Sequence, residues 1–348
     1  MKIAYFGYNS FLQHKRGIEN VIDFQSKTCV FEKIYYFHWG LITTAYKNDR
    51  FTCLSIKHCW YWPILLNIVL FRLKRKNKII IHSHNPLFSF CSIFKTDILT
   101  VHDGLYYLYK SYKSKFAFIF RIIEPLVYNK CTIIHFISNY TKEQSLFGKK
   151  KNFVIIPNTS HFETYVETKN TKINKNKNEK ITILIVRSIE VRARFDLLLQ
   201  VAEQLCDQNY EFIVAGKGPL LQYYQNKIVK IKLKNIVMLG YVDDIELLNL
   251  YSECDIVLMI AEYGEGFGLP IIEGYLFNKP VIASNRCAIP EVIISKEYLF
   301  ENDVESIIKS IKYVSNTKKE NFSDYYESHF SNFIVLSKLR NMYLKIHS

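Results

Sequence analysis

Short runs of β-branched and other apolar residues alternate with helical patterns along most of this 348-residue chain, and this alternation most constrains its fold. In the first half, each run ends in polar or turn-forming residues. The runs are "KIAYFGY", "KIIIHSHNP", "DILTVHDG", "CTIIHFIS" and "FVIIPNT". Because strands that alternate with helices form βαβ units, the pattern predicts a parallel sheet.

A polar stretch interrupts the alternation once. The segment "ETKNTKINKNKNEK" is charged and almost free of aliphatic side chains, which is typical of an exposed linker. The alternation then restarts with "ITILIVRS", "EFIVAGKG", "NIVMLGYV", "DIVLMIAE" and "PVIASN". We therefore predict an α/β chain with two doubly wound domains, at residues 1–165 and 181–324, joined by a linker at 166–180. The helical segment at about 325–348 is expected to pack back on the first domain or to pack on the second.

The two predicted domains also predict where ligands bind. In open α/β sheets, ligands bind outside the carboxyl ends of the strands. Two such domains in tandem therefore predict an active site in the cleft between them.

The charge distribution indicates an anionic partner for the first half of the chain. Residues 1–160 contain 23 Lys and Arg against 8 Asp and Glu, whereas residues 161–348 contain 23 against 24. The net charge of +14 is thus carried by the first half. Such a one-sided basic field favours nucleic acid, anionic lipid or a phosphorylated acceptor as partner, and a merely solvated basic surface is the alternative.

The remaining composition favours a cytoplasmic globular protein. Apolar residues make up 49% of the chain, which excludes wholesale disorder. The eight cysteines show no C-x-x-C pair and no metal-ligand spacing, so we expect reduced thiols. The start "MKIAYFGYN" lacks the apolar region of a signal peptide. The longest apolar run, about Trp60 to Phe71, is shorter than the roughly 18 residues that a membrane span needs.

One glycine-rich stretch, "AEYGEGFGLPIIEGYLFN", has the features of an anion site. Glu265 and Glu273 stand eight positions apart, with Gly266 and Gly268 in the turn that follows an apolar strand. Pro270 suits the first turn of a helix, where its missing N–H costs nothing. Bare N–H groups and the positive dipole end at a helix N-terminus bind anions. The alternative is a glycine loop that only caps a helix.

Several segments resemble the retaining glycosyltransferase family 4, whose GT-B fold has two Rossmann-like, doubly wound parallel-sheet domains facing across a cleft. "EGFGLPIIE" resembles the E-x7-E signature of that family, and "VAGKGP" resembles its I-x-G-x-G-P turn. "VIIPNT" resembles its V-I-P-N-G segment, with Thr159 in place of glycine. "MLGYVDDIELLNLYSECDIVLMIA" resembles the segment before the signature, with Ile260 and Ala261 in place of Pro-Ser. The resemblance covers most of the chain and is strongest from 210 to 292.

The resemblance implies a retaining, hexosyltransferase-type enzyme. Such an enzyme moves a sugar from a nucleotide diphosphate donor to a hydroxyl of a glycan acceptor. We expect a lipid-linked acceptor, such as a polyprenyl-diphosphate-linked glycan, in bacterial surface polysaccharide or glycoconjugate synthesis. The alternatives are a non-catalytic, basic nucleic-acid-binding protein, and an epimerase or phosphorylase with the same fold. No RNP sequence or basic heptad occurs, so nucleic acid is not an expected partner of the enzyme.

The resemblance also implies roles for the residues of the signature. Glu265 would contact the transferred sugar and Glu273 the ribose. Backbone N–H groups of the turn would hold the diphosphate or sugar, and the donor-binding residues there are Gly266, Phe267, Gly268 and Leu269.

Arginines after the first strand of the second domain would face the leaving diphosphate. "IVRSIEVRARFD" resembles the family segment G-R-L-x-x-x-K-G-x-D, with Arg187 matching the family arginine. Arg192 stands where the lysine normally falls, but Asp196 then lies one residue too far along. Arg194 is therefore a rival for the lysine role. Two arginines can clamp a developing diphosphate charge, and the alternative is surface arginines at a helix start.

In the first domain, the resemblance implies a donor-binding glycine and a catalytic histidine. Gly17 precedes a predicted helix, where the family often has two glycines whose N–H groups approach the donor phosphate. His102 ends the strand run "TVHDGL", where the family often has a cleft histidine that contacts the donor sugar; a structural role at the strand end is the alternative. His82 and His84 end another strand, and they either line the acceptor side or simply terminate that strand.

No metal or organic cofactor is predicted. No D-x-D triplet occurs, and Asp243 with Asp244 is better interpreted as a helix cap than as a metal site. The arginines and the helix N-terminus would serve as the counter-charge of the diphosphate.

Residues 58–78 indicate contact with a membrane surface. There an aromatic and apolar stretch precedes five Lys and Arg residues between Arg72 and Lys78. On anionic lipid, each basic residue near the surface is worth about 1 kcal/mol. We expect the first domain to lie on the inner face of the cell membrane, and a core helix with a basic end is the alternative.

Overall fold

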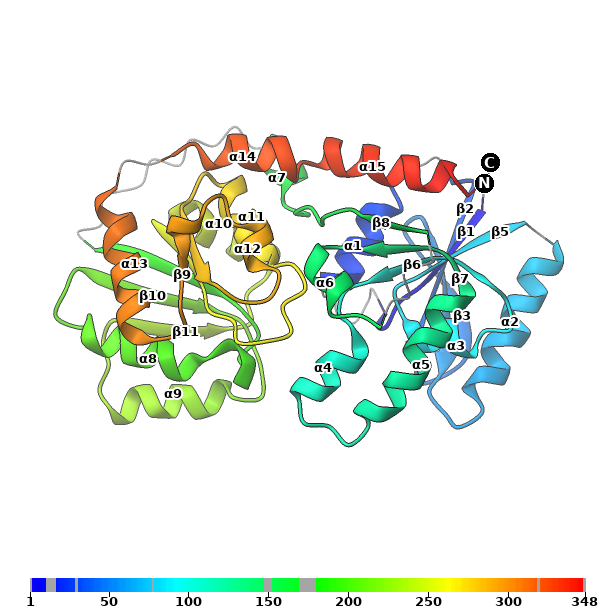
Figure 1. Ribbon diagram of the computed structural model, residues 1–348, viewed down its shortest axis with the longest axis horizontal. Helices are drawn as coiled ribbons and strands as arrows, with labels where there is room; N and C mark the ends of the chain where they lie inside the picture. The colour runs from blue at the N-terminus through cyan, green and yellow to red at the C-terminus, as the bar shows by residue number, and fades with distance from the viewer. Residues whose placement is uncertain are drawn as a thin grey trace. The chain divides into compact units, whose positions relative to one another are not determined.

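The computed structural model describes residues 2–10, 17–28, 31–76, 78–146, 152–168, 180–317 and 320–346. The chain divides into two compact units (Figure 1). Unit 1 comprises Met1–His161 and Phe333–Ser348, and unit 2 comprises Phe162–Asn332. Each unit is built on a largely parallel sheet, so the predicted fold class is confirmed. The predicted linker at 166–180 lies mostly outside the described residues.

Unit 1 contains an eight-stranded sheet in the order β3-β4-β2-β1-β5-β6-β7-β8. Only the β3–β4 pair is antiparallel. The strands are β1 (Lys2–Phe6), β2 (Lys33–Gly40), β3 (Thr44–Asn48), β4 (Phe51–Lys57), β5 (Ile79–Ser83), β6 (Thr96–Val101), β7 (Cys131–Phe136) and β8 (Phe153–Ile155). The sequence pattern predicted β1 and β5 to β8, and β2 to β4 extend the sheet beyond β1.

Helices cover both faces of this sheet. They are α1 (Gly17–Gln25), α2 (Trp62–Lys76), α3 (Pro86–Cys91), α4 (Leu105–Ser111), α5 (Ala117–Lys130), α6 (Asn139–Glu143) and α15 (Asn332–Leu344). On one face, Val335, Leu339 and Met342 of α15 join the core formed with β1 and β2. On the other face, Leu66 and Leu70 of α2 pack with the strands. The C-terminal helix therefore completes the core of unit 1, beside the N-terminal strand (Figure 1).

Unit 2 contains a six-stranded parallel sheet in the order β11-β10-β9-β12-β13-β14. The strands are β9 (Ile181–Val186), β10 (Tyr210–Ala215), β11 (Ile236–Gly240), β12 (Ile256–Met259), β13 (Val281–Ser284) and β14 (Leu299–Phe300). The central strands are apolar on both sides because helices cover both faces. The chain runs outward from β9 to β11 and then returns to β12 on the other side of β9. The carboxyl ends of β9 and β12 thus form the topological switch point, where ligands bind in folds of this kind.

The helices of unit 2 position its loops. They are α7 (Glu163–Thr168), α8 (Phe195–Gln204), α9 (Leu221–Lys230), α10 (Asp244–Glu253), α11 (Leu269–Leu276), α12 (Ile289–Val292), α13 (Val304–Asn316) and α14 (Phe322–His329), with 3₁₀ turns η1 (Val191–Ala193) and η2 (Lys296–Tyr298). Asp243 caps α10 by accepting from the Glu246 N–H at 2.8 Å, as the sequence predicted. A Cβ at Gly274 would lie 2.6 Å from Val281 Cγ2, so this glycine lets α11 pack closely on the sheet.

The cysteines and the longest apolar helices bear on two further expectations from the sequence. The seven cysteines among them are free, and Cys29 lies outside the described residues. In the part of the chain that the structure describes, no helix is both long and apolar enough to cross a membrane.

Candidate functional site

The turn between β12 and α11 has a backbone that requires glycine. Gly268 is the N-cap of α11, with φ 96° and ψ 60°, which is the left-handed region. A Cβ at this position would also lie 2.9 Å from Ile271 Cδ1. Pro270 falls in the first turn of α11, as predicted. Glycine and proline together therefore bend the chain sharply and start the helix at the carboxyl end of β12.

This turn leaves backbone donors available at the start of α11. Within the described residues, the N–H groups of Phe267, Gly268 and Leu269 have no acceptor, and the Ile271 N–H bonds the Gly268 carbonyl. The first N–H groups of a helix lack intrahelical partners and carry the positive end of its dipole. The buried Phe267 ring packs edge-on against Phe330 at 5.8 Å and so anchors the turn. The predicted anion site thus has its donors, and the predicted contacts of Gly266 to Leu269 with a donor stay predictions.

Arg187 and Glu265 meet at the topological switch point. Arg187 directly follows β9, and its Nη1 lies 3.1 Å from Glu265 Oε2. Their side chains are 7% and 19% exposed, so the pair is only partly open to solvent. Nε of Arg187 is buried and has no hydrogen-bond partner among the described residues. A buried donor without a partner costs about 1–3 kcal/mol, so this guanidinium retains unused capacity for an anion.

The backbone around Arg187 fixes where its side chain begins. Its N–H bonds the Ala215 carbonyl of β10 at 3.1 Å. Gly216 has φ 152°, and a Cβ there would lie 1.8 Å from the Arg187 carbonyl oxygen. The glycine of the segment "VAGKGP" therefore allows the ends of β9 and β10 to approach closely.

Arg192 ties the η1 turn to the β12–α11 turn. Its Nη1 donates to the Gly264 carbonyl, and its Nε lies 3.4 Å from Glu190 Oε2. The Glu262 N–H bonds the Arg192 carbonyl at 2.9 Å. Side chain and backbone of Arg192 thus both hold the loop that carries Glu265.

Arg194 is held by two carboxylates. It adopts the left-handed conformation (φ 49°) at the start of α8. Its Nε and Nη2 each lie 3.0 Å from an oxygen of Asp196, and its Nη1 lies 2.7 Å from Glu262 Oε2. The hydrogen bonds to Asp196 raise the pKa of Arg194. Burial raises the pKa of Asp196, but the hydrogen bond and charge of Arg194 together with backbone hydrogen bonds bring this pKa below its usual value. Because Arg192 and Arg194 both bond protein acceptors, which of them takes the predicted lysine role stays open.

The far side of the same loop is held by β13 and β14. Ser284 Oγ accepts from the Ala261 N–H at 3.0 Å and donates to Asn302 Oδ1 at 2.6 Å. The Asn302 amide donates in turn to the Ala261 carbonyl and to Glu262, each at 3.0 Å. Hydrogen bonds from both sides therefore preorganise the loop before Glu265.

Glu273 lies below the surface in the second turn of α11. Its side chain is buried, and its Oε2 accepts a 2.6 Å hydrogen bond from Tyr251 Oη. Burial and the Glu273 charge hold the pKa of Tyr251 well above its usual value, so the phenol stays a donor. The predicted contact of Glu273 with a ribose stays a prediction.

In unit 1, Gly17 is the exposed first residue of α1, next to residues that the structure does not describe. Two residues later, the buried Glu19 accepts from the Asn9 N–H at 3.1 Å. The start of α1 is thus fixed to the loop after β1. The predicted approach of Gly17 to a donor phosphate stays a prediction.

His102 follows β6 and is half-buried. Its Nε2 lies 2.8 Å from His84 Nδ1, and His84 Nε2 lies 3.1 Å from Gln25 Oε1. Burial, with a smaller effect of His135, lowers the pKa of His102 to about 3. The imidazole is therefore neutral at ordinary pH, with one N–H donor and one acceptor nitrogen.

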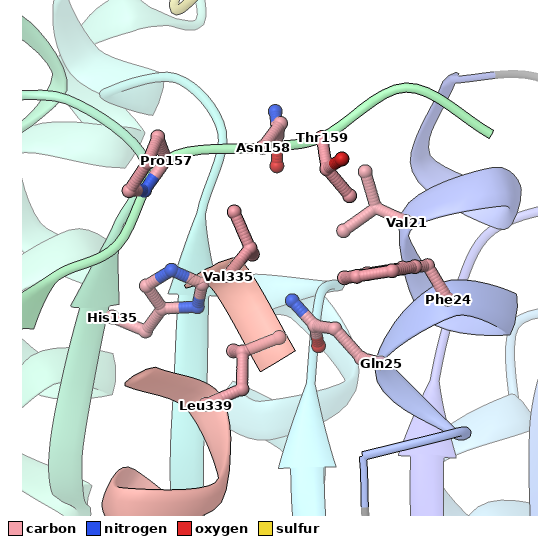
Figure 2. A pocket seen from close by; sticks show the side chains of 9 residues that line it. All are labelled: Val21, Phe24, Gln25, His135, Pro157, Asn158, Thr159, Val335 and Leu339. Carbon is pink, nitrogen blue, oxygen red and sulfur yellow. The ribbon is translucent and has the colours of Figure 1, made fainter. Parts of the chain in front are cut away.

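His82 and His84 are buried, so they do not lie on a surface at the strand end. The sequence did not predict their partners, which are Thr100 and Tyr343 for His82 and Gln25 for His84, nor the bond from Thr100 to His135. Gln25 and His135 also line a small cavity of about 10 Å³, with room for about one water (Figure 2). Alternating histidines in "HSH" and a histidine inside "CTIIHF" were the available signals. Among the described residues, no group of three or more His, Cys, Asp or Glu side chains could hold a metal ion.

Comparison with known families gives a match to one family model, which lies within unit 2 apart from the residues that the structure does not describe. Residues 166–327 match the family model Glycosyl transferases group 1. A Klebsiella pneumoniae protein described as an uncharacterized 41.2 kDa protein in cps region is 36% identical over 124 residues, 35% of this chain and 33% of the relative. The Escherichia coli O-antigen chain mannosyltransferase B is 40% identical over 70 residues, 20% of this chain and 18% of the relative. The chain thus matches a third or less of the length of these curated relatives.

Solved structures match nearly the whole chain. The sucrose-phosphate synthase of Thermosynechococcus elongatus has a TM-score of 0.79 and 13% identity, covering 99% of both chains. Anabaena HepE, in complex with UDP and glucose, has a TM-score of 0.76 and 13% identity, covering 99% of this chain and 100% of that one. At this identity the likeness establishes the fold.

Proposed function

We propose that this chain, which has the GT-B fold, is a retaining glycosyltransferase of the glycosyl transferases group 1, the family whose model matches residues 166–327. It would move a sugar from a nucleotide diphosphate donor to a hydroxyl of a glycan acceptor. The observation that carries the proposal is the buried Arg187 guanidinium, whose Nε lacks a partner among the described residues. It lies at the switch point of the unit 2 sheet, where such folds bind ligands.

The diphosphate is assigned to Arg187 and the start of α11. Arg187 pairs with Glu265, which belongs to the same turn as the N–H groups of Phe267, Gly268 and Leu269. Charge builds on the diphosphate as the glycosidic bond breaks, and preorganised donors stabilise that charge. A guanidinium and a helix N-terminus supply positive charge of the kind that a metal ion supplies elsewhere, so the proposed reaction needs no metal.

Glu265 is assigned to the sugar. Without a ligand its carboxylate pairs with Arg187. A phosphate that bonds Arg187 would compete for the guanidinium and leave Glu265 free to accept from a sugar hydroxyl. Glu273 is assigned to the ribose, with Tyr251 holding one of its oxygens. In unit 1, His102 is assigned to a hydroxyl of the sugar and Gly17 to the donor phosphate.

The proposed reaction retains the anomeric configuration. The bond between the anomeric carbon and the diphosphate oxygen breaks, and the electron pair stays on the diphosphate. The acceptor hydroxyl forms the new bond on the same face and gives its proton to the departing phosphate oxygen. Arg187 stabilises the leaving group throughout, which is the interaction that gains most in the transition state.

A lipid-linked acceptor is favoured by the surface of unit 1. Helix α2 exposes Ile64, Ile68 and Phe71 in one stripe, and α5 exposes Phe118, Ile122 and Leu126 in another. Helix α3 contacts both helices (Figure 1). The same part of the chain carries basic residues: Arg72, Lys74 and Arg75 in α2, Lys95 after α3 and Arg121 in α5. Apolar stripes on helices that also carry cations fit an anionic bilayer. A nucleic-acid ligand would not account for the exposed apolar side chains.

The proposed pathway is bacterial surface polysaccharide or glycoconjugate synthesis, at the cytoplasmic face of the membrane. Two relatives support this choice: the Klebsiella pneumoniae protein in a cps region and the Escherichia coli O-antigen chain mannosyltransferase B. The acceptor would then be a glycan on a lipid carrier that the stripes of unit 1 bring within reach.

A thermal-shift screen of UDP, GDP, ADP and their sugars tests the proposed donor site. A nucleotide that binds only the folded protein at 100 times its Kd should stabilise it by about 2.7 kcal/mol. Arg187→Ala should abolish that shift, whereas Arg286→Ala, which removes an exposed arginine paired with Glu301, should leave it unchanged. If none of these ligands shifts the melting temperature, the proposed donor site is wrong.

A further inference from the structure

Four histidines of unit 1 form two hydrogen-bonded chains, and the end groups of the chains fix where the protons lie. The histidines are His82, His84, His102 and His135, and burial lowers the pKa of each. All four are therefore neutral near pH 7. A neutral imidazole has one N–H donor and one acceptor nitrogen, so each bond in a chain determines the next.

The first chain begins at a backbone carbonyl. His135 Nε2 lies 2.9 Å from the Ile156 carbonyl oxygen, which only accepts, so His135 carries its proton on Nε2. Its Nδ1 then accepts from Thr100 Oγ1 at 2.9 Å. Thr100 in turn accepts from His82 Nε2 at 2.7 Å, which leaves His82 Nδ1 to accept from Tyr343 Oη at 2.7 Å. His135 and His82 are thus both Nε2–H tautomers.

The second chain begins at the Gln25 side chain, at the end of α1. Gln25 Oε1 lies 3.1 Å from His84 Nε2, so His84 carries its proton on Nε2. Its Nδ1 then accepts from His102 Nε2 at 2.8 Å. Figure 2 shows the amide nitrogen of Gln25 on the side of the cavity and its oxygen directed away from it. With this amide orientation, His102 is also an Nε2–H tautomer.

We propose that Gln25, acting through His84, is a positioning residue that holds His102 as the Nε2–H tautomer, so that its Nδ1 accepts a hydrogen bond from a substrate hydroxyl. Within the described residues, no group bonds His102 Nδ1, and this atom is not among the buried side-chain atoms without a partner. It is therefore the ring nitrogen open to a ligand. The substrate part of the proposal rests on the proposed glycosyltransferase function, and the tautomer part does not.

The tautomer decides which ligand group His102 can bind. A lone pair on Nδ1 accepts from a hydroxyl and repels a phosphate or carboxylate oxygen. An N–H at the same place would do the reverse. The relay thus makes His102 selective for a ligand that presents a hydroxyl, which fits a sugar better than a diphosphate.

The relay also explains why a polar chain lies in the core. His84 is almost completely buried, and a buried imidazole with an unpaired nitrogen costs about 1–3 kcal/mol. Gln25 removes that cost on one side of His84, and His102 removes it on the other. Rotation of the Gln25 amide by 180° would place a donor against His84 Nε2 and reverse both tautomers.

Long-range ¹H–¹⁵N correlation spectra of histidine-labelled, full-length protein test the tautomers directly. We expect all four histidines as Nε2–H in the wild-type protein at pH 7. In Gln25→Leu, His84 and His102 should become mixtures, whereas His82 and His135, anchored by the Ile156 carbonyl, should not change. Gln25→Glu keeps the acceptor and should keep the wild-type tautomers. Leu339→Ala, at the same cavity, controls for disturbed packing.

Nδ1–H on His102 of the wild-type protein, or unchanged tautomers in Gln25→Leu, would overturn the relay. Binding of UDP and UDP-glucose separates the relay from the proposed function. Gln25→Leu should bind UDP as the wild type does, lose the added affinity for UDP-glucose, and regain it in Gln25→Glu. Equal UDP-glucose binding in Gln25→Leu and wild type would overturn the hydroxyl contact. Wild-type protein with the expected tautomers that binds neither probe would instead contradict the proposed donor.

Discussion

Nη1 of Arg187 lies 3.1 Å from Oε2 of Glu265, across the carboxyl ends of the paired strands β9 and β12. The two residues are 78 positions apart in the sequence, and the reversal of strand order between β9 and β12 brings them together. The arginine is nearly buried and retains an unpaired Nε among the described residues. An anion at this point would meet a preorganised donor.

Arg187→Ala should lower kcat by about 10²–10³, the usual effect of removing a preorganised donor to a developing charge. Arg187→Lys should recover only part of the rate, because an ammonium cannot reproduce the planar fork of the guanidinium. Steady-state rates with the donor found by thermal shift are the measurement. Arg286→Ala is the matched control, and similar rates in the two alanine variants would contradict the assignment.

Glu265→Gln should lower turnover while leaving the affinity for the free nucleotide nearly unchanged. The amide still fills the site, but it no longer accepts from a sugar hydroxyl with a full negative charge, and charged hydrogen bonds are roughly twice as strong as neutral ones. Kd for the nucleotide diphosphate and kcat for transfer should be measured together. A loss of nucleotide affinity with unchanged kcat would place Glu265 on the nucleotide rather than on the sugar.

Gly268→Ala should destabilise unit 2. A left-handed backbone costs a residue with a Cβ about 1–2 kcal/mol, and the new methyl would also crowd Ile271. Urea unfolding of the variant and of the wild type gives the difference. Ala288→Gly is the control, because it exchanges the same two residue types at a buried position with an ordinary φ. It separates the effect of the left-handed backbone at position 268 from the general difference between alanine and glycine.

Tyr251→Phe should lower the free energy of unfolding by about 1.5–3 kcal/mol, because it removes the buried hydrogen bond that Tyr251 Oη donates to the carboxylate of Glu273. Tyr241→Phe, at an exposed tyrosine of the same unit, should change stability little. Chemical denaturation measures both. Equal stability of the two variants would show that Glu273 has another partner for this oxygen.

The free energy of unfolding should fall as the pH is lowered below about 6.5. In the folded state, burial lowers the pKa of His102 to about 3 and of His135 to about 4, so the unfolded chain binds more protons between these values and 6.5. Stability therefore rises with pH across this window, by about 1.4 kcal/mol per pH unit for each such histidine. His135→Asn should reduce the slope, as urea unfolding at pH 7, 6 and 5 would reveal.

Unit 1 should bind anionic vesicles through the stripes of α2 and α5. Ile68→Glu and Ile122→Glu place charges on exposed positions, so each should weaken sedimentation with phosphatidylglycerol vesicles without unfolding the protein. Tyr223→Glu, at an exposed position of unit 2, is the control. Absence of wild-type binding at low salt would contradict the membrane contact.

The sequence by itself determined the two α/β units, because runs with strand and helix periods alternate and each strand must be buried on both faces. It identified five strands of each sheet, the start of α11 at Pro270 and the Asp243 cap, since these depend on local backbone chemistry. It missed the short β14 of unit 2, and it missed β2, β3 and β4 of unit 1, where "KIYYFHWG" and its neighbours mix aromatic, charged and polar residues. In the structure β2 pairs with β1, β4 pairs with β2 and β3 pairs with β4, and this pairing, rather than any local pattern, makes those three segments strands.

Tertiary structure alone decided which polar groups meet. Arg187 was singled out together with Arg192 and Arg194, and only the fold shows that the latter two bond loop acceptors while Arg187 Nε has none among the described residues. The chain from Gln25 through His84 to His102 joins the end of α1 to the residues that follow β5 and β6, which no sequence spacing connects. The periodicity of apolar residues is a local property of the sequence and indicates which side chains are buried. Hydrogen-bond partners depend instead on which strands are neighbours in the sheet.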